Sequence, residues 1–194
     1  AELVERAATK TASAVLVERA GEVAGEVSAW LVEGAGWAAQ LEKRSAVVAC
    51  LSAALGESIS REIAESAFEA MHGRDCSWLV EYESWRSQIA QRDFVVRTLH
   101  QAAARDQLVS ATLVEGAVAL LADSESWLDV GHEVKQTIDE RMRAIAELKE
   151  AFYGSLITAD LVRAQLAKCG DAEHWLAEAA EWRGEIEQRH AVVQ

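Results

Sequence analysis

The sequence predicts an all-α fold made of four tandem two-helix repeats, each about 48 residues long. A Trp-Leu pair recurs at steps of 48, 49 and 48 residues, and the chain has no proline, the residue that breaks helix interiors. No segment alternates apolar and polar residues with the period of two that is typical of a strand. The four pairs are Trp30-Leu31, Trp78-Leu79, Trp127-Leu128 and Trp175-Leu176.

Each Trp-Leu pair opens a stripe of residues that predicts one long helix of about 25 residues per repeat. In the first copy, Trp37, Leu41 and Val48 stand 7, 11 and 18 positions after the tryptophan. These offsets place side chains on one face of a helix. An arginine stands 14 positions after the tryptophan on the same face in every copy, at Arg44, Arg92, Arg141 and Arg189.

A shorter apolar segment precedes each pair and predicts a helix of about 15 residues. Glycine stands five residues before the tryptophan in three copies, at Gly25, Gly73 and Gly170. A glycine just past a helix end adopts positive φ easily, so we expect these glycines to close the short helices. The expected N-capping residues of the long helices follow, at Asp75, Ser124 and Asp171. The expected turns between repeats are near Gly56, Arg105-Asp106 and Gly154.

A second period of 97 residues, half the chain length of 194, is superimposed on the first: the pattern of 85–96 recurs at 182–193. We therefore expect a single helical-repeat domain, residues 1–194, with an internal duplication of 1–97 and 98–194. The sequence begins and ends within the expected long helix, which predicts an amphipathic half-helix at each end. Burial of their apolar faces favours pairing of these ends, either within one molecule, giving a closed ring or compact bundle, or between molecules.

The matched ends, the missing proline and the doubled period resemble a closed helical-hairpin repeat of the toroid or α-solenoid type, as produced by computational design. The resemblance covers the whole chain but rests on architecture, and no natural family is indicated. It implies a structural or scaffold protein, in which the repeats bury their Trp, Leu, Ile and Val stripes against one another.

The acidic composition narrows the possible partners. A net charge of −13 disfavours nucleic acid and anionic membrane surfaces, because both repel an acidic protein. No apolar run approaches the roughly 20 residues of a membrane-spanning helix. The cysteines, an odd number without paired spacing, are expected to be reduced, which favours a cytoplasmic location. The expected partner is the chain itself, through its terminal half-helices.

The Trp-Arg stripe is the candidate site of an alternative function, a binding module. Aromatic side chains suit a helical peptide or a small apolar ligand, and arginines on the same face suit a small anion, held in a cationic ring if the stripe faces a central opening. The structural interpretation is that the tryptophans form core, while each arginine stacks on a tryptophan one heptad earlier or pairs with an acid of a neighbouring repeat. The candidate ligand-binding residues are Arg44, Arg92, Arg141, Arg189, Trp37, Trp85 and Trp182.

The sequence shows no signature of catalysis or of a metal site. His72 and Cys76 flank one expected turn, and Cys169 and His174 flank another, but their positions do not correspond. Two ligands per turn make only half of a tetrahedral site. Glycine-rich phosphate loops, nucleophile elbows and zinc-protease motifs are missing. We therefore predict no catalytic residues, no metal and no cofactor, and we expect the protein not to be an enzyme.

Overall fold

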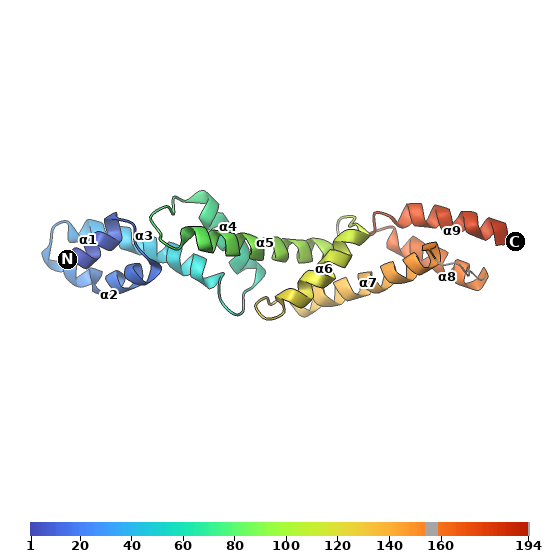
Figure 1. The fold of residues 1–194 in the computed structure, drawn as a ribbon, viewed down its shortest axis with the longest axis horizontal. Coiled ribbons are helices and arrows are strands. Elements are labelled where there is room, and N and C mark those ends of the chain that lie inside the picture. Colours follow the sequence, from blue (N-terminus) through green and yellow to red (C-terminus); the bar gives the residue numbers. More distant parts are fainter. Residues whose placement is uncertain (154–158, 194) are drawn as a thin grey trace. The chain divides into compact units, whose positions relative to one another are not determined.

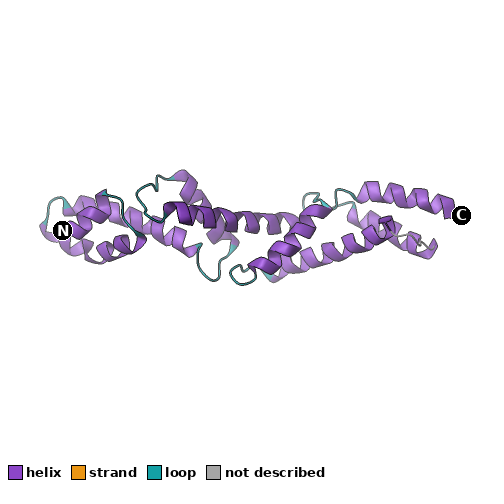
Figure 2. Cartoon of the chain, viewed as in Figure 1, coloured by secondary structure: helices purple, strands orange, loops and turns teal. Residues whose placement is uncertain are grey.

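The computed structural model of the chain describes residues 1–153 and 159–193. Among these residues, the regular secondary structure consists of α-helices, without a β-strand (Figures 1 and 2). The side chain of Arg189 lies outside the described part. The prediction of an all-α fold is confirmed. In chain order the helices are α1 (Glu2–Thr9), α2 (Ala14–Trp30), α3 (Gly34–Ala53), α4 (Arg61–Gly73), α5 (Tyr82–Ala103), α6 (Ala111–Ser124), α7 (His132–Tyr153), α8 (Ala159–Ala172) and α9 (Ala179–Val193).

Short and long helices alternate from α2 to α7, and α8 and α9 are of nearly equal length, with 14 and 15 residues. The helices α2, α4, α6 and α8 contain 13 to 17 residues, close to the expected 15. The helices α3, α5 and α7 contain 20 to 22 residues, fewer than the expected 25. Two of the expected turns, at Gly56 and at Arg105-Asp106, lie between helices, and the one near Gly154 lies outside the described residues.

The chain divides into two compact units, which are described separately. The N-terminal unit contains residues 1–94 together with 126–129, and the C-terminal unit contains 95–125 and the residues from 130 onward. The expected single domain with an internal duplication stays a prediction.

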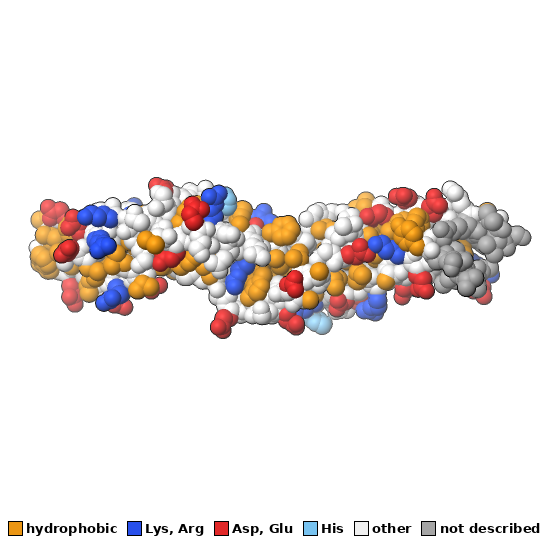
Figure 3. Space-filling view, viewed as in Figure 1, with side chains coloured by type: hydrophobic (Ala, Val, Ile, Leu, Met, Phe, Trp, Pro, Cys, Tyr) orange, Lys and Arg blue, Asp and Glu red, His pale blue; other side chains and the backbone are white. Residues whose placement is uncertain are grey.

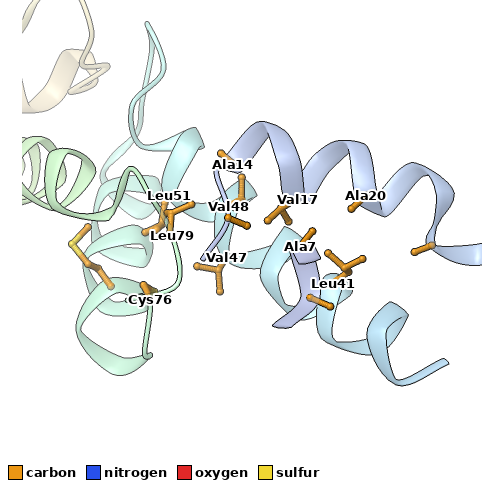
Figure 4. Close-up of a cluster of buried hydrophobic side chains, with 14 of the residues drawn as sticks. Ala7, Ala14, Val17, Ala20, Leu41, Val47, Val48, Leu51, Cys76 and Leu79 are labelled. Carbon is orange, nitrogen blue, oxygen red and sulfur yellow. The ribbon is translucent and has the colours of Figure 1, made fainter. Parts of the chain in front are cut away.

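The core of the N-terminal unit is built from small and branched aliphatic side chains of α1, α2 and α3 (Figure 4). Helix α2 buries Val17, Ala20 and Val27, and α3 buries Leu41 and Leu51. Intervals of three, seven and ten residues keep these side chains on one face of each helix. The alanine allows close helix packing, and α1 packs against both α2 and α3.

The core of the C-terminal unit joins α7 to its neighbours α6, α8 and α9. Val114 of α6, with Ile145 and Leu148 of α7, is fully buried. Trp182 of α9 is 6% exposed, and its ring centroid lies 6.1 Å from that of Phe152. The core interpretation of the tryptophan stripe therefore holds for Trp182.

The Trp-Leu pairs do not lie on the long helices, which corrects the prediction. Trp30 is the last residue of α2, and the other three pairs lie in the connections that precede α5, α7 and α9. The long helices begin four or five residues after the tryptophan, at Gly34, Tyr82, His132 and Ala179. The physical reason is that the leucine backbone is extended: Leu31 has φ −114° and ψ 129°. In the other three repeats, the leucine forms the backbone bridge described below.

Glycine does not close the short helices, so this expectation is also wrong. Gly25 and Gly170 lie inside α2 and α8, and Gly73 is the last residue of α4. Among the described residues, the one positive glycine φ is that of Gly131, at 77°. The short helix instead passes into an extended residue, as at Arg74 after α4, with φ −133° and ψ 147°. Extended backbone needs no glycine.

The three expected N-cap residues do not cap the long helices. Asp75 lies in a loop, and Ser124 and Asp171 lie within α6 and α8. Side-chain capping is found on short helices instead. Ser13 at the start of α2 and Ser110 at the start of α6 each accept a hydrogen bond from the amide three residues on, at 3.2 and 3.1 Å. These bonds satisfy helix N–H groups that lack intrahelical acceptors.

The surface is mixed in character. Acidic side chains are scattered over the visible face, with apolar side chains between them (Figure 3). None of the described helices combines the length and the apolar composition needed to cross a bilayer.

Candidate functional site

The tryptophans that open the second, third and fourth repeats lie at junctions made by the backbone itself. In the first junction, the amide of Ala12 donates to the carbonyl of Trp78 at 2.8 Å, and the amide of Val80 donates to the carbonyl of Ala12 at 3.1 Å. These two bonds form an isolated parallel bridge between Ala12 and Leu79. Equivalent bridges join Ile59 to Leu128 in the N-terminal unit and Val109 to Leu176 in the C-terminal unit.

An arginine completes the first junction. Nη1 of Arg44, on α3, donates to the carbonyl oxygens of Ala7 at 2.5 Å and Lys10 at 2.7 Å. The guanidinium carbon lies 4.4 Å from the ring centroid of Trp78. Carbonyls at the C-terminal end of a helix lack intrahelical donors and form the negative end of its dipole. Arg44 therefore satisfies the end of α1 and holds it to the loop that carries Trp78.

The second junction repeats this arrangement within the N-terminal unit. Nη1 of Arg92, on α5, donates to the carbonyl oxygens of Ala54 and Gly56, both at 2.8 Å. The guanidinium lies 4.7 Å from the ring centroid of Trp127. Arg92 thus closes the end of α3 as Arg44 closes the end of α1.

The third junction, in the C-terminal unit, uses the guanidinium differently. Nη1 of Arg141 donates to the carbonyl of Ala102 at 2.6 Å, and Nη2 donates to the carbonyl of Ala104 at 2.7 Å. Its guanidinium lies 4.9 Å from the ring centroid of Trp175. Two nitrogens are therefore engaged here, whereas one nitrogen makes both bonds in the first two junctions.

The three arginines are desolvated cations balanced by dipoles. Arg44 and Arg141 are each 7% exposed, and Arg92 is half-buried. Burial lowers the pKa of all three below the ordinary value, and the nearby Arg105 lowers that of Arg141 further. The ordinary pKa is so high that each guanidinium stays protonated. In the described part of the chain none of the three forms an ion pair. The partners that stabilise their positive charge are therefore carbonyl oxygens and tryptophan rings.

The stacking partner differs from both structural alternatives drawn from the sequence. Each of the three arginines stacks on the tryptophan that opens the next repeat, rather than on the one a heptad earlier or beside an acid. Trp37 and Trp85 instead pack, half-buried, against the N-terminal core. A ligand role for these residues stays a prediction, and the side chain of Arg189 lies outside the described residues.

A glutamate three residues after the tryptophan is a junction residue that the sequence analysis missed. Oε2 of Glu81 accepts a hydrogen bond from the amide of Ala14 at 3.2 Å, at the start of α2. Both carboxylate oxygens of Glu178 accept from the amide of Ala111 at 3.1 Å, at the start of α6. A carboxylate at a helix N-terminus interacts favourably with the dipole. The signal was available, because glutamate also occupies this position in the first repeat, at Glu33.

A pocket of about 400 Å³ borders the first junction. Its lining residues are Gln40, Lys43, Arg44, Ala46, Val47, Arg74, Asp75 and Trp78. A smaller pocket of about 150 Å³ occupies the equivalent place at the second junction, lined by Gln88, Gln91, Arg92 and Trp127. The first pocket therefore carries three cationic side chains and one carboxylate, and the second carries one cation.

Within residues 1–153 and 159–193, no group of three or more His, Cys, Asp or Glu side chains is arranged to hold a metal ion. The cysteines flanking the expected turns, Cys76 and Cys169, are buried, and burial is the main cause that raises the pKa of each thiol. Comparison of the chain with protein-family models, with curated proteins and with solved structures finds no match.

Proposed function

We propose that the protein is a structural helical-repeat protein without catalytic activity, which serves as a scaffold by holding successive helix pairs in register. The observation that supports this most strongly is the threefold recurrence of one junction. Each junction combines a backbone bridge, an arginine that binds two carbonyl oxygens, and a tryptophan under that arginine.

The energetics of the junction favour this structural role. A hydrogen bond to a charged group contributes about 1.5–3 kcal/mol, and a desolvated cation–π contact adds about 2 kcal/mol. The guanidinium groups of Arg44, Arg92 and Arg141 direct these interactions to the protein's own backbone and rings. The same groups are thereby less available to a ligand along the stripe.

The exposed first tryptophan suggests how chain ends associate. Trp30 is 67% exposed, whereas Trp78, at the equivalent position, is half-buried beneath Arg44. Val32, two residues on, is 92% exposed. Arg189 occupies the fourth position in the series of arginines. Trp30 therefore leaves an exposed aromatic surface in the first repeat. We propose that the terminal half-helices associate, either within one molecule, closing a ring, or between two copies.

The mass in solution, measured by sedimentation, distinguishes these two forms of association. A monomer that is destabilised equally by Trp30→Ala and Arg189→Gln supports closure, and a dimer that both variants dissociate supports exchange between copies. A monomer that melts like the parent in both variants contradicts association of the ends and leaves the scaffold role intact.

The scaffold role is tested through ligand linkage. A ligand that binds the folded state raises the melting temperature, and a scaffold without a ligand shows no such rise. We expect no rise with helical peptides or apolar dyes. A rise that is lost in Arg92→Gln would instead favour the second candidate, a module that binds ligands along the Trp-Arg stripe.

A further inference from the structure

The first junction differs from the other two in the charge that surrounds a shared backbone arrangement. The residue before the arginine is Lys43 in the first junction, Gln91 in the second and Glu140 in the third. The residue four positions before the tryptophan is Arg74, Asp123 and Asp171 in the same order. Two cationic residues, Lys43 and Arg74, thus accompany Arg44 in a chain whose net charge is −13. The repeat architecture does not require them, since the other junctions form without them.

These cations face one cavity. Lys43 on α3 and Arg74 after α4 both line the pocket of about 400 Å³, together with Arg44 and Trp78. Both side chains are exposed, and within the described residues neither makes a hydrogen bond or an ion pair. The one carboxylate in the lining, Asp75, accepts both the amide and the hydroxyl hydrogen bond of Ser77 through a single oxygen. The pocket therefore has an excess of two positive charges.

The buried Arg44 adds to the positive electrostatic potential in this pocket. Its side chain is buried, with 7% of its surface exposed, and it has no carboxylate partner among the described residues. Its Nε is also buried and makes no hydrogen bond. Nη1 makes both carbonyl bonds, and Nη2 makes no hydrogen bond within the described part of the chain. A desolvated cation is screened less than a surface cation, so its potential extends into the adjoining pocket. An anion there would be attracted by three positive charges at once.

We propose that this pocket binds a phosphate group, as inorganic phosphate or as the monoester of a small molecule. Arginine and lysine donate charge-assisted hydrogen bonds to phosphate oxygens. The volume exceeds that of a phosphate ion and lies in the range typical of small-molecule sites. The body of a monoester fits against the apolar wall formed by Ala46, Val47 and the ring of Trp78. The site shares Arg44 and Trp78 with the first junction and so needs that junction to be formed, whereas Lys43 and Arg74, the cations that would contact the phosphate, take no part in the junction.

Calorimetric titration of the full chain at low ionic strength tests the proposal, with inorganic phosphate and phenyl phosphate as the two probes. We expect one site per chain, with binding that weakens as salt is added. Tighter binding of phenyl phosphate identifies a monoester with an apolar body as the ligand class, and equal binding identifies the phosphate group alone. The absence of binding by both probes would overturn the proposal.

A double variant and a matched control separate the pocket from the overall charge. Lys43→Gln with Arg74→Gln is expected to weaken binding about tenfold, since two charge-assisted contacts are lost. The control, Arg19→Gln with Arg86→Gln, removes two exposed cations outside the pocket and is expected to bind like the parent. Equal weakening in both variants, or none in the first, would contradict the site. Helical content and melting temperature measured without phosphate show that each variant is folded.

Discussion

The first and third junctions show how one backbone arrangement carries two different surroundings. Both have a parallel bridge, a buried arginine on two carbonyl oxygens and a tryptophan under the guanidinium. Arg44 uses one nitrogen for both carbonyls, whereas Arg141 uses two. Lys43 precedes the first arginine, and Glu140 precedes the third. Both junctions thus satisfy two backbone carbonyls, but they differ in the guanidinium nitrogens used and in the charge of the exposed residue beside the arginine.

This difference separates two kinds of constraint. Two helix-end carbonyls must find donors wherever the junction is buried, because an unsatisfied buried acceptor costs about 1–3 kcal/mol. The exposed positions next to the arginines, such as Lys43 and Glu140, have no buried backbone group to satisfy. Charge at those positions is free to serve another purpose, which is the basis for assigning a ligand to the first junction alone.

The largest expected effect comes from replacing the arginines with lysine. Arg141→Lys leaves one of two carbonyls without its donor, because an ammonium is a point charge and cannot reproduce the guanidinium fork. We expect it to lower the free energy of unfolding by about 2 kcal/mol. Arg44→Lys is expected to cost less, because one nitrogen already serves both carbonyls. Urea unfolding followed by circular dichroism measures the difference.

Arg143→Lys is the matched control, because Arg143 is exposed on the same helix, α7, and lines no junction. It should unfold like the parent. If Arg44→Lys cost as much as Arg141→Lys, the number of engaged nitrogens would have no bearing on stability, and the two junctions would be energetically alike.

A second, smaller effect compares the starts of α2 and α4 in the N-terminal unit. Ser13 caps α2 through its hydroxyl, whereas Ser60, at the start of α4, makes no side-chain capping bond. Ser13→Ala should therefore lower the free energy of unfolding by about 1 kcal/mol, and Ser60→Ala by much less. Equal losses in the same denaturation assay would show that serine stabilises these positions by a cause other than capping.

The sequence was sufficient for the helical class and for the equivalence of the arginines, because burial on one helix face repeats at regular intervals. It was misleading for the Trp-Leu pairs. An offset of seven residues, close to two helical turns, connects Trp30 with Trp37 across the break between α2 and α3. Periodicity alone does not distinguish a continuous helix from two helices separated by such a break.

The contacts of the junction lay beyond prediction for a different reason. Arg44, Arg92 and Arg141 bind carbonyl oxygens 34 to 39 residues earlier, and a backbone acceptor has no side-chain signature. The cations of the first pocket come from two elements, α3 and the loop after α4, so their proximity follows from the packing of those helices. The repeat period identified which residues are equivalent in successive repeats, but it did not identify the residues that they contact.

The smallest expected effect tests whether charge alone distinguishes the first pocket. Asp75→Asn removes the carboxylate that opposes an anion, while the amide oxygen still accepts the two hydrogen bonds from Ser77. We expect phosphate to bind about threefold more tightly, a change typical of one exposed charge pair. The side-chain hydrogen bond from Ser77, and then its amide bond, lower the pKa of Asp75 below the ordinary carboxyl value.

The lowered pKa determines how this effect depends on pH. The stability that the ionised Asp75 contributes to the folded protein is present above the ordinary carboxyl pKa of about 3.9. It is lost only as the pH falls through the lower pKa that Asp75 has in the folded protein. The carboxylate is therefore charged from pH 5 to 8, so over that range the gain from Asp75→Asn follows the charge of the ligand. In calorimetric titrations at fixed ionic strength, the gain should be larger at pH 8, where phosphate is mainly a dianion, and smaller but still present at pH 5, where it is mainly a monoanion. A gain that disappears toward pH 5 would mean that Asp75 already binds a proton there. In that case hydrogen bonding, rather than repulsion, would govern what the pocket accepts.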